Sequence, residues 1–434
     1  MRKSAIILMA FLCYVPSLTP ALALNAITSA VGSSTLADER EAVEEVLAEV
    51  NAEVPNFAQN ADICLLFSNV YYDEPEMLVG ALRENGVSIP VWGATSSHAM
   101  MTTDGYEISE NGGVSMLFLS GKTPRDLKVG VAAADIGTTR PSAVSSGKEA
   151  IEEAIAMLGD SPQIILVSSA PGMEEAIIEG IESVVGRGIP IVGGGSADNT
   201  VEGYWKQFAN DQVYEHAVVI AAISTSVRIG YDFAHGYTPT EKTAYVKASS
   251  EYGRLVEELD DTPALDLYAE WINKDIEQLE GMDLLGASLF SPVATHSSVR
   301  GRDYYVPGHP AVGDSDNGTM FCFKELPAAT KITLMEATAE DLVLCVGDSI
   351  EEALEKGRIQ AGHIGALFLV HCAGRRFAIG DEQMEDVVIE IKERIGDETP
   401  FITLFPFGEQ GNNYITGNRH GSLCVAPLII SDRP

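Results

Sequence analysis

The most distinctive polar residues of the sequence lie in one short segment, 371–376, which reads His-Cys-Ala-Gly-Arg-Arg. It directly follows a run, 365–370, that contains no polar side chain. An arginine in such a place could hold a carboxylate through two parallel hydrogen bonds. In this acid-rich chain, each arginine could instead pair with an Asp or Glu. The segment contributes four candidate ligand-binding residues: His371, Cys372, Arg375 and Arg376.

Cys372 is also the residue that could act as a nucleophile, provided that a histidine served as its base. His371 is poorly placed for that task, because adjacent residues on a strand point to opposite faces of the sheet. His420 or another histidine would have to take the role. Since the sequence does not identify the base, we predict no catalytic residue. A cysteine-dependent enzyme is kept as an alternative.

A second candidate site is the glycine-rich segment 193–198, Gly-Gly-Gly-Ser-Ala-Asp. Backbone N–H groups of such small residues could face a carboxylate or another anion. The alternative is a tight turn that needs positive φ. A nucleotide site is not supported, because the GxGxxG spacing and the lysine of a phosphate loop are both absent. The candidate anion-binding residues are Gly193, Gly194, Gly195 and Ser196.

Two carboxylates complete the set of candidate site residues. Glu409 could accept an ammonium group, and Asp198 could do the same nearer the glycine-rich segment. Alternatively, each is a turn residue or a helix-cap acceptor. An anion site together with a cation site would suit an amino acid, which is therefore one candidate ligand.

The cysteines do not indicate a metal site. Outside the N-terminal segment they are far apart, without CxxC pairs and without the histidine spacing typical of zinc. They are Cys64, Cys322, Cys345, Cys372 and Cys424. The sequence predicts no metal and no cofactor, and it does not decide whether two of these cysteines form a disulfide.

An internal duplication positions these residues. Segment 89–96 recurs as 189–196, and segment 127–131 recurs as 227–231, so the unit is about 100 residues long. Segment 63–68 likewise matches 164–169. Matches in the same order at nearly constant spacing indicate one structural unit used twice.

The unit is interpreted as strand, helix and strand. Apolar runs of strand length precede helical stretches at 76–85 and 173–186, and an Ile-Pro pair begins the second strand in each copy. This spacing is typical of a βαβ crossover, so the two strands should be parallel. Further strands, 114–119 with 128–133 and 218–224 with 227–232, are expected to pair as antiparallel neighbours.

The C-terminal third follows the same scheme more loosely, with a strand at 365–372, a helix at 387–395, a strand from 400 and a last strand at 422–430. Strands are expected at 284–290 and 319–323, and helices at 252–259 and after Pro263. The expected fold class is α/β, with mixed sheets, crossovers and antiparallel strands in two lobes. Ligands of such sheets bind beyond the carboxyl ends of the strands, where the candidate residues lie.

Charge and the N-terminus limit the function. Lys and Arg total 28 against 63 Asp and Glu, a formal charge of −35, which argues against nucleic-acid binding. A short basic start, an apolar run at 5–15 and the small residues before position 24 are typical of a signal peptide cleaved after Ala23. A periplasmic or secreted protein is expected, with an uncleaved anchor as the alternative.

Two sets of residues resemble the FIST family, named for F-box and intracellular signal transduction proteins. Segments 189–198, 227–230 and 235–236 look like its N-terminal domain, and 365–376 with 407–409 is similar to its C-terminal domain. The resemblance implies a sensory module for small ligands, with amino acids suggested, and it supplies no catalytic residues. The expected parts are a signal peptide at 1–23, a helix and linker at 36–58, and lobes at 60–245 and 250–430.

We therefore expect an exported protein that binds a small polar ligand and passes the signal to a separate membrane partner. The chain shows no kinase, cyclase or methyl-acceptor segment that could act as its own output domain. The alternatives are the cysteine-dependent enzyme and a non-catalytic assembly or scaffold protein.

Overall fold

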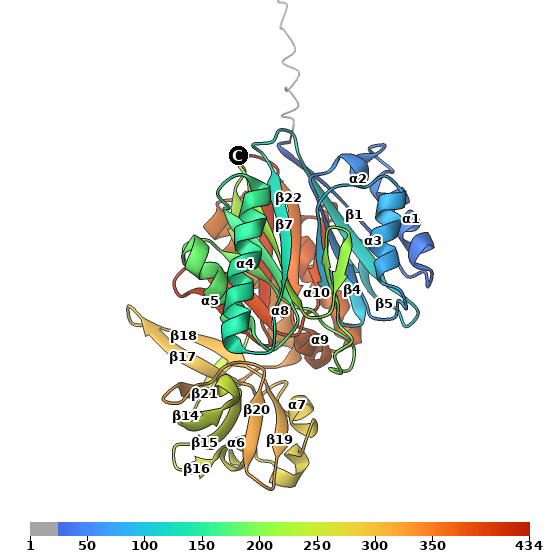
Figure 1. Cartoon of the computed structure of the whole chain (residues 1–434). Coiled ribbons are helices and arrows are strands. Elements are labelled where there is room, and N and C mark those ends of the chain that lie inside the picture. Colours follow the sequence, from blue (N-terminus) through green and yellow to red (C-terminus); the bar gives the residue numbers. More distant parts are fainter. Residues whose placement is uncertain (1–24) are drawn as a thin grey trace, which may run out of the picture.

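The computed structural model describes residues 25–434, and the predicted signal peptide lies outside the described residues. A body of helices surrounding sheets carries a smaller lobe at one end (Figure 1). Within the described residues, no helix is long and apolar enough to cross a membrane.

Three six-stranded sheets with one shared strand pattern form the body. Sheet 1 runs β1 (Ile27–Ser34), β6 (Val114–Gly121), β2 (Ile63–Ser68), β3 (Val91–Thr95), β10 (Gln207–Ala209) and β11 (Gln212–Tyr214). Sheet 2 runs β7 (Lys128–Asp135), β12 (Ala217–Ser224), β8 (Ile164–Ser169), β9 (Ile191–Gly195), β24 (Glu409–Asn413) and β25 (Gly417–Gly421). Sheet 3 runs β13 (Ile229–Tyr231), β26 (Val425–Ser431), β22 (Ile364–His371), β23 (Phe401–Leu404), β4 (Ala99–Thr102) and β5 (Gly105–Ile108).

The third and fourth strands of every sheet are parallel, and all other neighbours are antiparallel. This confirms the predicted crossovers and the repeat, and it extends the repeat to a third copy in the C-terminal part of the chain. The first strands of the three sheets begin at Ile27, Lys128 and Ile229, about one hundred residues apart.

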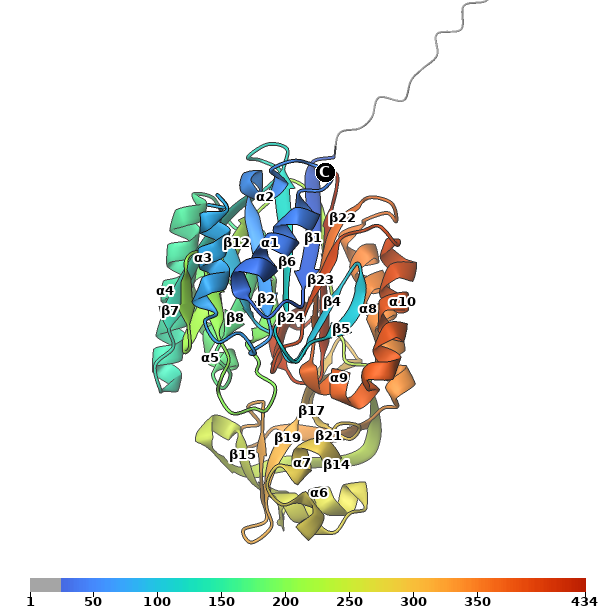
Figure 2. The same ribbon diagram turned by 90° about the vertical axis from the view of Figure 1, so that its right-hand side faces the viewer.

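Each sheet is covered on its outer side by two long helices (Figure 2). They are α1 (Glu39–Val50) and α3 (Glu76–Glu84) on sheet 1, α4 (Arg140–Leu158) and α5 (Glu174–Val185) on sheet 2, and α8 (Ala339–Gly357) and α10 (Met384–Ile395) on sheet 3. The predicted helices at 76–85, 173–186 and 387–395 are confirmed, and so is a helix within the predicted segment 36–58. Short helices α2 (Phe57–Asn60), α9 (Ala373–Ile379) and η3 (Asp381–Gln383) lie in connections.

The inner faces of the three sheets meet in a central core. Trp92 of sheet 1 packs edge-on against Phe368 of sheet 3, with ring centroids 5.6 Å apart, and Phe67 packs against both rings. The Nε1 of Trp92 donates to the carbonyl of Val219 in sheet 2, so one side chain touches all three sheets. Strands buried on both faces explain why their sequences are continuous apolar runs rather than alternating ones.

The predicted strand pairs 114–119 with 128–133 and 218–224 with 227–232 are wrong. The strand β6 pairs with β1 and β2, whereas β7 begins the next sheet and pairs with β12. In the same way β12 remains in sheet 2, and β13 begins sheet 3. The chain thus moves to a new sheet at the point where a short hairpin was expected.

Each repeat gives its terminal hairpin to another sheet. The hairpin β4–β5 of the first repeat joins sheet 3, β10–β11 of the second joins sheet 1, and β24–β25 of the third joins sheet 2. The sheets therefore do not separate at residue 245, where the boundary between two lobes was predicted, because strands from both sides of that position share sheets 2 and 3.

The lobe is an insertion into the third repeat, between β13 and α8, with a core of its own. It contains β14 (Thr238–Ser250), β15 (Leu255–Leu259), β16 (Thr262–Pro263), β17 (Val293–Val299), β18 (Arg302–Gly308), β19 (Pro310–Asp314), β20 (Thr319–Cys322) and β21 (Lys331–Glu336). Its helices are η1 (Glu251–Gly253), α6 (Ala264–Ile272), η2 (Ile276–Leu279) and α7 (Asp283–Ala287).

Two predictions for the inserted lobe are wrong. The expected helix at 252–259 is the strand β15, and the expected strand at 284–290 is occupied by the helix α7. Both elements have five residues, too few for hydrophobic periodicity to distinguish a helix from a strand. The strand near 319–323 and the helix after Pro263 are confirmed.

Replacing Gly193 by Ala is expected to destabilise the body by more than about 3 kcal/mol, since the added carbon would overlap rigid backbone. Its Cβ would lie 1.8 Å from the carbonyl oxygen of Val167 on the adjacent parallel strand. Gly188→Ala is the control, because a Cβ there meets nothing within 4 Å. Urea unfolding of both variants measures the difference, and equal midpoints would contradict the close-approach role.

Candidate functional site

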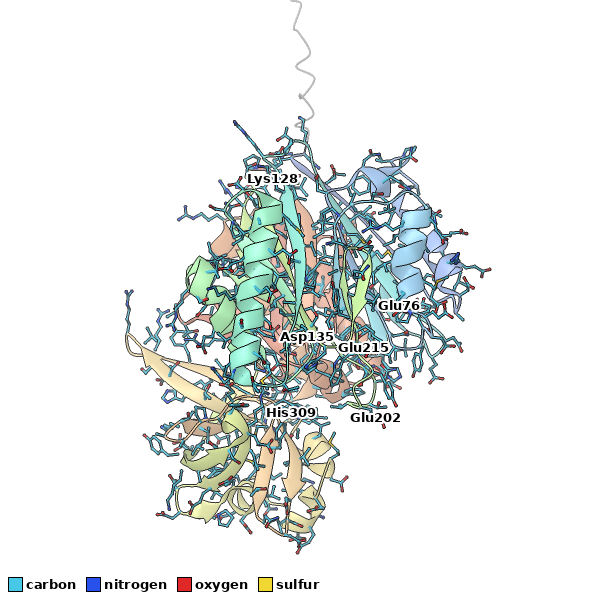
Figure 3. All side chains as sticks on the ribbon, in the orientation of Figure 1. Glu76, Lys128, Asp135, Glu202, Glu215 and His309 are labelled. Carbon is cyan, nitrogen blue, oxygen red and sulfur yellow. The ribbon has the colours of Figure 1, made fainter. Side chains whose placement is uncertain are left out.

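The carboxyl ends of the parallel strands converge at the end of the body that faces the inserted lobe. Figure 3 shows Asp135, the last residue of β7, at this end, whereas Lys128, its first residue, lies at the opposite end. Because β7 and β8 are both antiparallel to β12, the strand β8 ends on the same side as β7. His309 of the lobe is also labelled at this junction (Figure 3).

A cleft of about 360 Å³ lies between the body and the lobe. The body contributes the segments that follow β9, β22 and β23, and the lobe contributes α7 and its surroundings. The residues lining it are Asn199, Thr200, Val201, Met282, Leu285, Gly286, Leu289, His309, Phe323, Cys372, Gly374, Phe377, Phe407, Gly408 and Ser422. Most of these walls are apolar, with a few polar groups among them.

Cys372 is the one predicted site residue that lines this cleft. Burial and the neighbouring Glu409 raise the pKa of the Cys372 thiol, so the thiol is protonated at neutral pH. His309 lines the same cleft, and its Nε2 lies 3.0 Å from the carbonyl of Leu285. Burial lowers the pKa of His309 to about 4, which keeps it uncharged. The arrangement offers polarity but no activated nucleophile.

His371 and Glu409 lie behind the cleft. His371 is fully buried, and neither ring nitrogen has a hydrogen-bond partner among the described residues. Burial and then Arg375 lower the pKa of His371. One oxygen of Glu409 accepts from the N–H of Cys424 at 2.8 Å, and burial raises the pKa of Glu409 to about 8. Glu409 is therefore a neutral acid at pH 7 and not the ammonium acceptor that was expected.

The two arginines are used inside the protein. Arg375 is fully buried and donates to the backbone carbonyls of His235, Leu342 and Leu423. Arg376 pairs with Asp381 at 2.7 Å and donates to the hydroxyl of Tyr106 at 3.0 Å. Neither lines the cleft. Arg376 thus fits the pairing alternative, whereas Arg375 is held by backbone carbonyls and not by an Asp or Glu of the described residues.

The glycine-rich segment serves close packing of the backbone. Gly193, Gly194 and Gly195 belong to β9, and a Cβ on Gly194 or Gly195 would lie within 2.5 Å of Pro406 or of the Phe407 carbonyl. The N–H of Gly195 donates to the carbonyl of Gly408 at 2.9 Å. This differs from the predicted anion cradle, because the strand is held against the third repeat.

The last two predicted residues, Ser196 and Asp198, also use their polar atoms in hydrogen bonds within the protein. Ser196 donates through its N–H and its hydroxyl to the carbonyl of Ser169, and its hydroxyl accepts from Gln207. The carboxylate of Asp198 accepts from the five consecutive backbone N–H groups of residues 200–204. Asp198 thus shapes the loop 199–204, which forms a wall of the cleft, and does not face a ligand cation.

Residues of the inserted lobe were missed by sequence reasoning. Met282, Leu285, Leu289 and His309 come from the lobe, where α7 was taken for a strand. Phe377, which follows the double arginine directly, is half exposed in the structure and could have been noted as an apolar residue beside the candidate segment.

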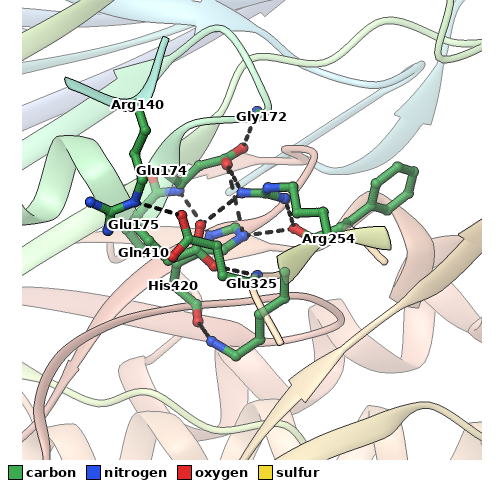
Figure 4. A network of polar contacts seen from close by, with 10 residues as sticks. Arg140, Gly172, Glu174, Glu175, Arg254, Glu325, Gln410 and His420 are labelled. Carbon is green, nitrogen blue, oxygen red and sulfur yellow. Dashed lines mark hydrogen bonds and ion pairs between the residues drawn. The ribbon is translucent and has the colours of Figure 1, made fainter. Parts of the chain in front are cut away.

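A buried ion network fastens the lobe to the body (Figure 4). Arg254 of the lobe contacts Glu174 at 2.8 Å and Glu175 at 2.7 Å, both on α5. Arg140 of α4 pairs with Glu325 of the lobe at 3.1 Å, and the lobe's Lys324 donates to the carbonyl of His420. These contacts are largely enclosed, so each charge depends on its partner.

The same network contains a group of metal-ligating types, Glu174, Glu175 and His420, with atoms within 4.8 Å of one another. The Arg254 guanidinium already bridges the two carboxylates. Burial opposes ionisation of Glu175, but His420, Arg254 and Lys324 outweigh it and lower the pKa of Glu175 to about 2. The acids are thus compensated by cations of the protein itself, and the group is an ion-pair anchor.

Comparison with known proteins identifies both halves of the chain. The FIST N domain matches residues 62–262, and the FIST C domain matches residues 264–412. An uncharacterized protein of Methanocaldococcus jannaschii is 30% identical over 96 residues, which is 22% of this chain and 18% of the length of that relative.

Among solved structures, a cyanuric acid hydrolase from A. caulinodans aligns over 93% of this chain and 98% of its own, with 9% identity and a TM-score of 0.38. PurLQS from Thermotoga maritima aligns over 95% of this chain and 74% of its own, with 8% identity and a TM-score of 0.23. Similarity this distant carries no implication for activity.

Replacing Arg254 by Met is expected to loosen the lobe by about 3–5 kcal/mol, because two buried carboxylates would lose their counter-ion. Hydrogen exchange in β15 of the lobe measures the change. Arg40→Met, in a pair exposed by about half on each side, is the control and should cost less than about 1 kcal/mol.

The low pKa of Glu175 implies stability that is present above pH about 4.5 and lost as the pH falls toward 2. An Arg254→Met protein with unchanged exchange and acid sensitivity would contradict the anchor.

The Glu409→Gln variant is expected to be more stable than the wild type at pH 8 to 9. The pKa of Glu409 is about 8 in the folded protein and near 4.5 in the unfolded chain, so the folded protein retains a proton that the unfolded chain releases. The stability of the wild type should therefore fall as the pH rises from about 4.5 through about 8, and glutamine removes this pH dependence. Urea unfolding across pH 4 to 9 tests this, with the exposed Glu107→Gln as control. If the free energy of unfolding of wild type and Glu409→Gln had the same pH dependence, Glu409 would not be a neutral buried acid in the folded protein.

Proposed function

Because the chain belongs to the FIST family, whose domains are sensory domains associated with signal transduction, we propose that it is a small-molecule receptor whose ligand binds in the cleft between the body and the inserted lobe. The observation that carries this proposal is the cleft itself. Its volume of about 360 Å³ suits a small molecule, and its walls come from both parts of the molecule.

The chemistry of the walls indicates the kind of ligand. Leu285, Leu289, Phe323, Phe377 and Phe407 supply mainly apolar surface, while Cys372, His309, Ser422 and Asn199 supply a few polar groups. The charged residues nominated from the sequence are engaged elsewhere. The ligand we propose is therefore predominantly apolar, with one or two polar groups, and an amino acid with a large apolar side chain is a candidate within that class.

Ligand contact with both walls gives a route to a signal. The lobe is an insertion attached through two chain connections, between β13 and β14 and between β21 and α8. A molecule that contacts the lobe and the body together binds the closed arrangement better than any opened one. It therefore shifts the population toward closure.

The output and the location are further parts of the proposal. We propose that the lobe position is read by a separate partner at a membrane, and that the protein works in the periplasm or outside the cell after export. Support for export comes from the basic start, apolar run and small residues of the N-terminal segment.

Gly286→Leu is expected to abolish ligand binding. Helical spacing places Gly286 on the same face of the α7 region as Met282 and Leu289, both of which line the cleft, and its Cβ would meet nothing within 4 Å. The measurement is thermal unfolding with a panel of amino acids, aromatic acids, phenols and amines. At 100 times the dissociation constant, a ligand adds about 2.7 kcal/mol of stability.

Gly80→Leu on α3 is the matched control, because a Cβ at this helical glycine also meets nothing within 4 Å and it does not line the cleft. Saturable stabilisation of wild type and Gly80→Leu, but not of Gly286→Leu, supports the proposal. The proposal is contradicted if no compound of the panel stabilises the wild type, or if every compound that does so stabilises all three proteins equally.

A further inference from the structure

A second, smaller cavity adjoins the cleft and has a different character. It measures about 210 Å³ and is lined by Pro171, Gly172, Glu174, Val201, Trp205, Arg254, Phe321, Phe323 and Phe407. Val201, Phe323 and Phe407 also line the cleft, so the two cavities share a wall. We call this second cavity the ring chamber.

Four aromatic side chains from three parts of the chain surround the ring chamber. Trp205 and Phe407 lie edge to face with centroids 6.4 Å apart, and Phe321 and Phe323 of the lobe do the same at 6.4 Å. All four are only partly buried, although each packs beside buried neighbours. Their remaining free surface therefore includes the walls of the chamber, which an apolar occupant would remove from water.

The floor of the ring chamber is the ion pair of Arg254 and Glu174, which belongs to the network in Figure 4. Arg254 already contacts two carboxylates and the carbonyl of Phe323. A ligand carboxylate would have to compete with both acids, and a ligand cation would lie against the guanidinium. A neutral group is thus favoured over a charged one.

Val201 is one of the three residues that line both cavities, and its backbone is strained. Its φ is 62°, in the left-handed region that a β-branched residue rarely adopts. The Asp198 carboxylate enforces this conformation by accepting the N–H of Val201 together with those of its neighbours. Strain of this kind costs about 1–3 kcal/mol and is characteristic of functional sites.

We propose that the ring chamber is a second subsite of the same receptor, that it takes a neutral planar aromatic group of the ligand, and that Val201 is the partition between this group and the rest of the molecule. The proposal rests on the proposed function for its biological meaning. The volume is sufficient, since a dry cavity of about 150 Å³ in another protein holds benzene. Edge-to-face contacts with the surrounding rings favour an aromatic occupant over an aliphatic one of the same size.

Calorimetric titration with p-cresol and with 4-methylcyclohexanol, a saturated molecule of similar shape, tests this on the full chain. p-Cresol should bind about tenfold more tightly than 4-methylcyclohexanol. Trp205→Leu should weaken p-cresol by about tenfold. Tyr204→Leu is the matched control, because the neighbouring Tyr204 is 64% exposed and does not line the chamber. Equal affinity for the two probes, or equal effects of the two variants, would overturn the subsite.

A second variant tests the partition without removing a ring. Val201→Gly accommodates the positive φ and opens the shared wall, so the two-ring probe 2-naphthol should gain affinity by about tenfold. Ala329→Gly, at φ 69° on an exposed loop of the lobe, is the control and should change nothing. An unchanged affinity of Val201→Gly for 2-naphthol would exclude the partition role.

The outcomes separate the two proposals. If a panel compound stabilises the wild type but not Gly286→Leu, and Trp205→Leu binds p-cresol as tightly as the wild type, the cleft receptor is supported. The ring chamber is then excluded as a subsite. If p-cresol binds more tightly than 4-methylcyclohexanol and Trp205→Leu weakens it, the ring chamber is supported as an aromatic site. If, in the same experiments, no panel compound loses its stabilising effect in Gly286→Leu, the cleft receptor is excluded.

Discussion

A closed ring of three backbone hydrogen bonds holds the three repeats together. The N–H of Ala197 donates to Thr95 at 2.9 Å, that of Phe407 to Gly195 at 3.0 Å, and that of Ser97 to Phe405 at 3.0 Å. Every donor lies two residues beyond the acceptor position of its own repeat, so each repeat gives one bond and receives one. Side chains take no part in these bonds, and they therefore fix where the second parallel strands end without dictating the residues there. The glycines of the second repeat permit the approach.

The ring lies at the end of the body where the equivalent strands of the three repeats end. Ser68, Ser169 and His371 are the last residues of equivalent strands, and each sits beside the ring. In the first two repeats the N–H of the next segment, Ser96 or Ser196, returns to the carbonyl of that serine. Pro406 occupies the equivalent place in the third repeat and has no N–H to give. The third repeat also carries the inserted lobe, and the cleft lies where the strand ends of the body face that lobe.

Much of the body could be predicted because its information is local. Apolar runs bounded by Ser or Gly, with helical periodicity between them, identify each crossover, and the constant spacing identifies the repeat. Pairing of β6 with β7 was wrong because proximity in sequence usually implies proximity in a sheet, and here the hairpins exchange between repeats. The lobe was misread because its elements are short. Reasoning from strand ends led to Cys372, which lines the cleft, but the α7 side of the cleft depends on a long-range contact that no local pattern encodes.

The charged residues that sequence reasoning assigned to the site belong to the scaffold of the protein. Arg375, Arg376 and Asp198 looked like ligand-binding groups because charged residues at strand ends usually are, yet each satisfies backbone or side-chain groups that the turns leave open. A charged group whose polar atoms are largely taken up by neighbouring groups has little left to offer a ligand. In the proposed receptor, recognition falls to the shape and apolar surface of the cleft, and the Arg254 network connects the lobe to the body. Two residues of this network, Arg254 and Glu174, also line the ring chamber, so the ion-pair anchor and the second cavity share residues. In the proposed receptor, a change in the apolar walls of the cleft would alter the fit of the ligand while the ion pairs of the anchor are preserved.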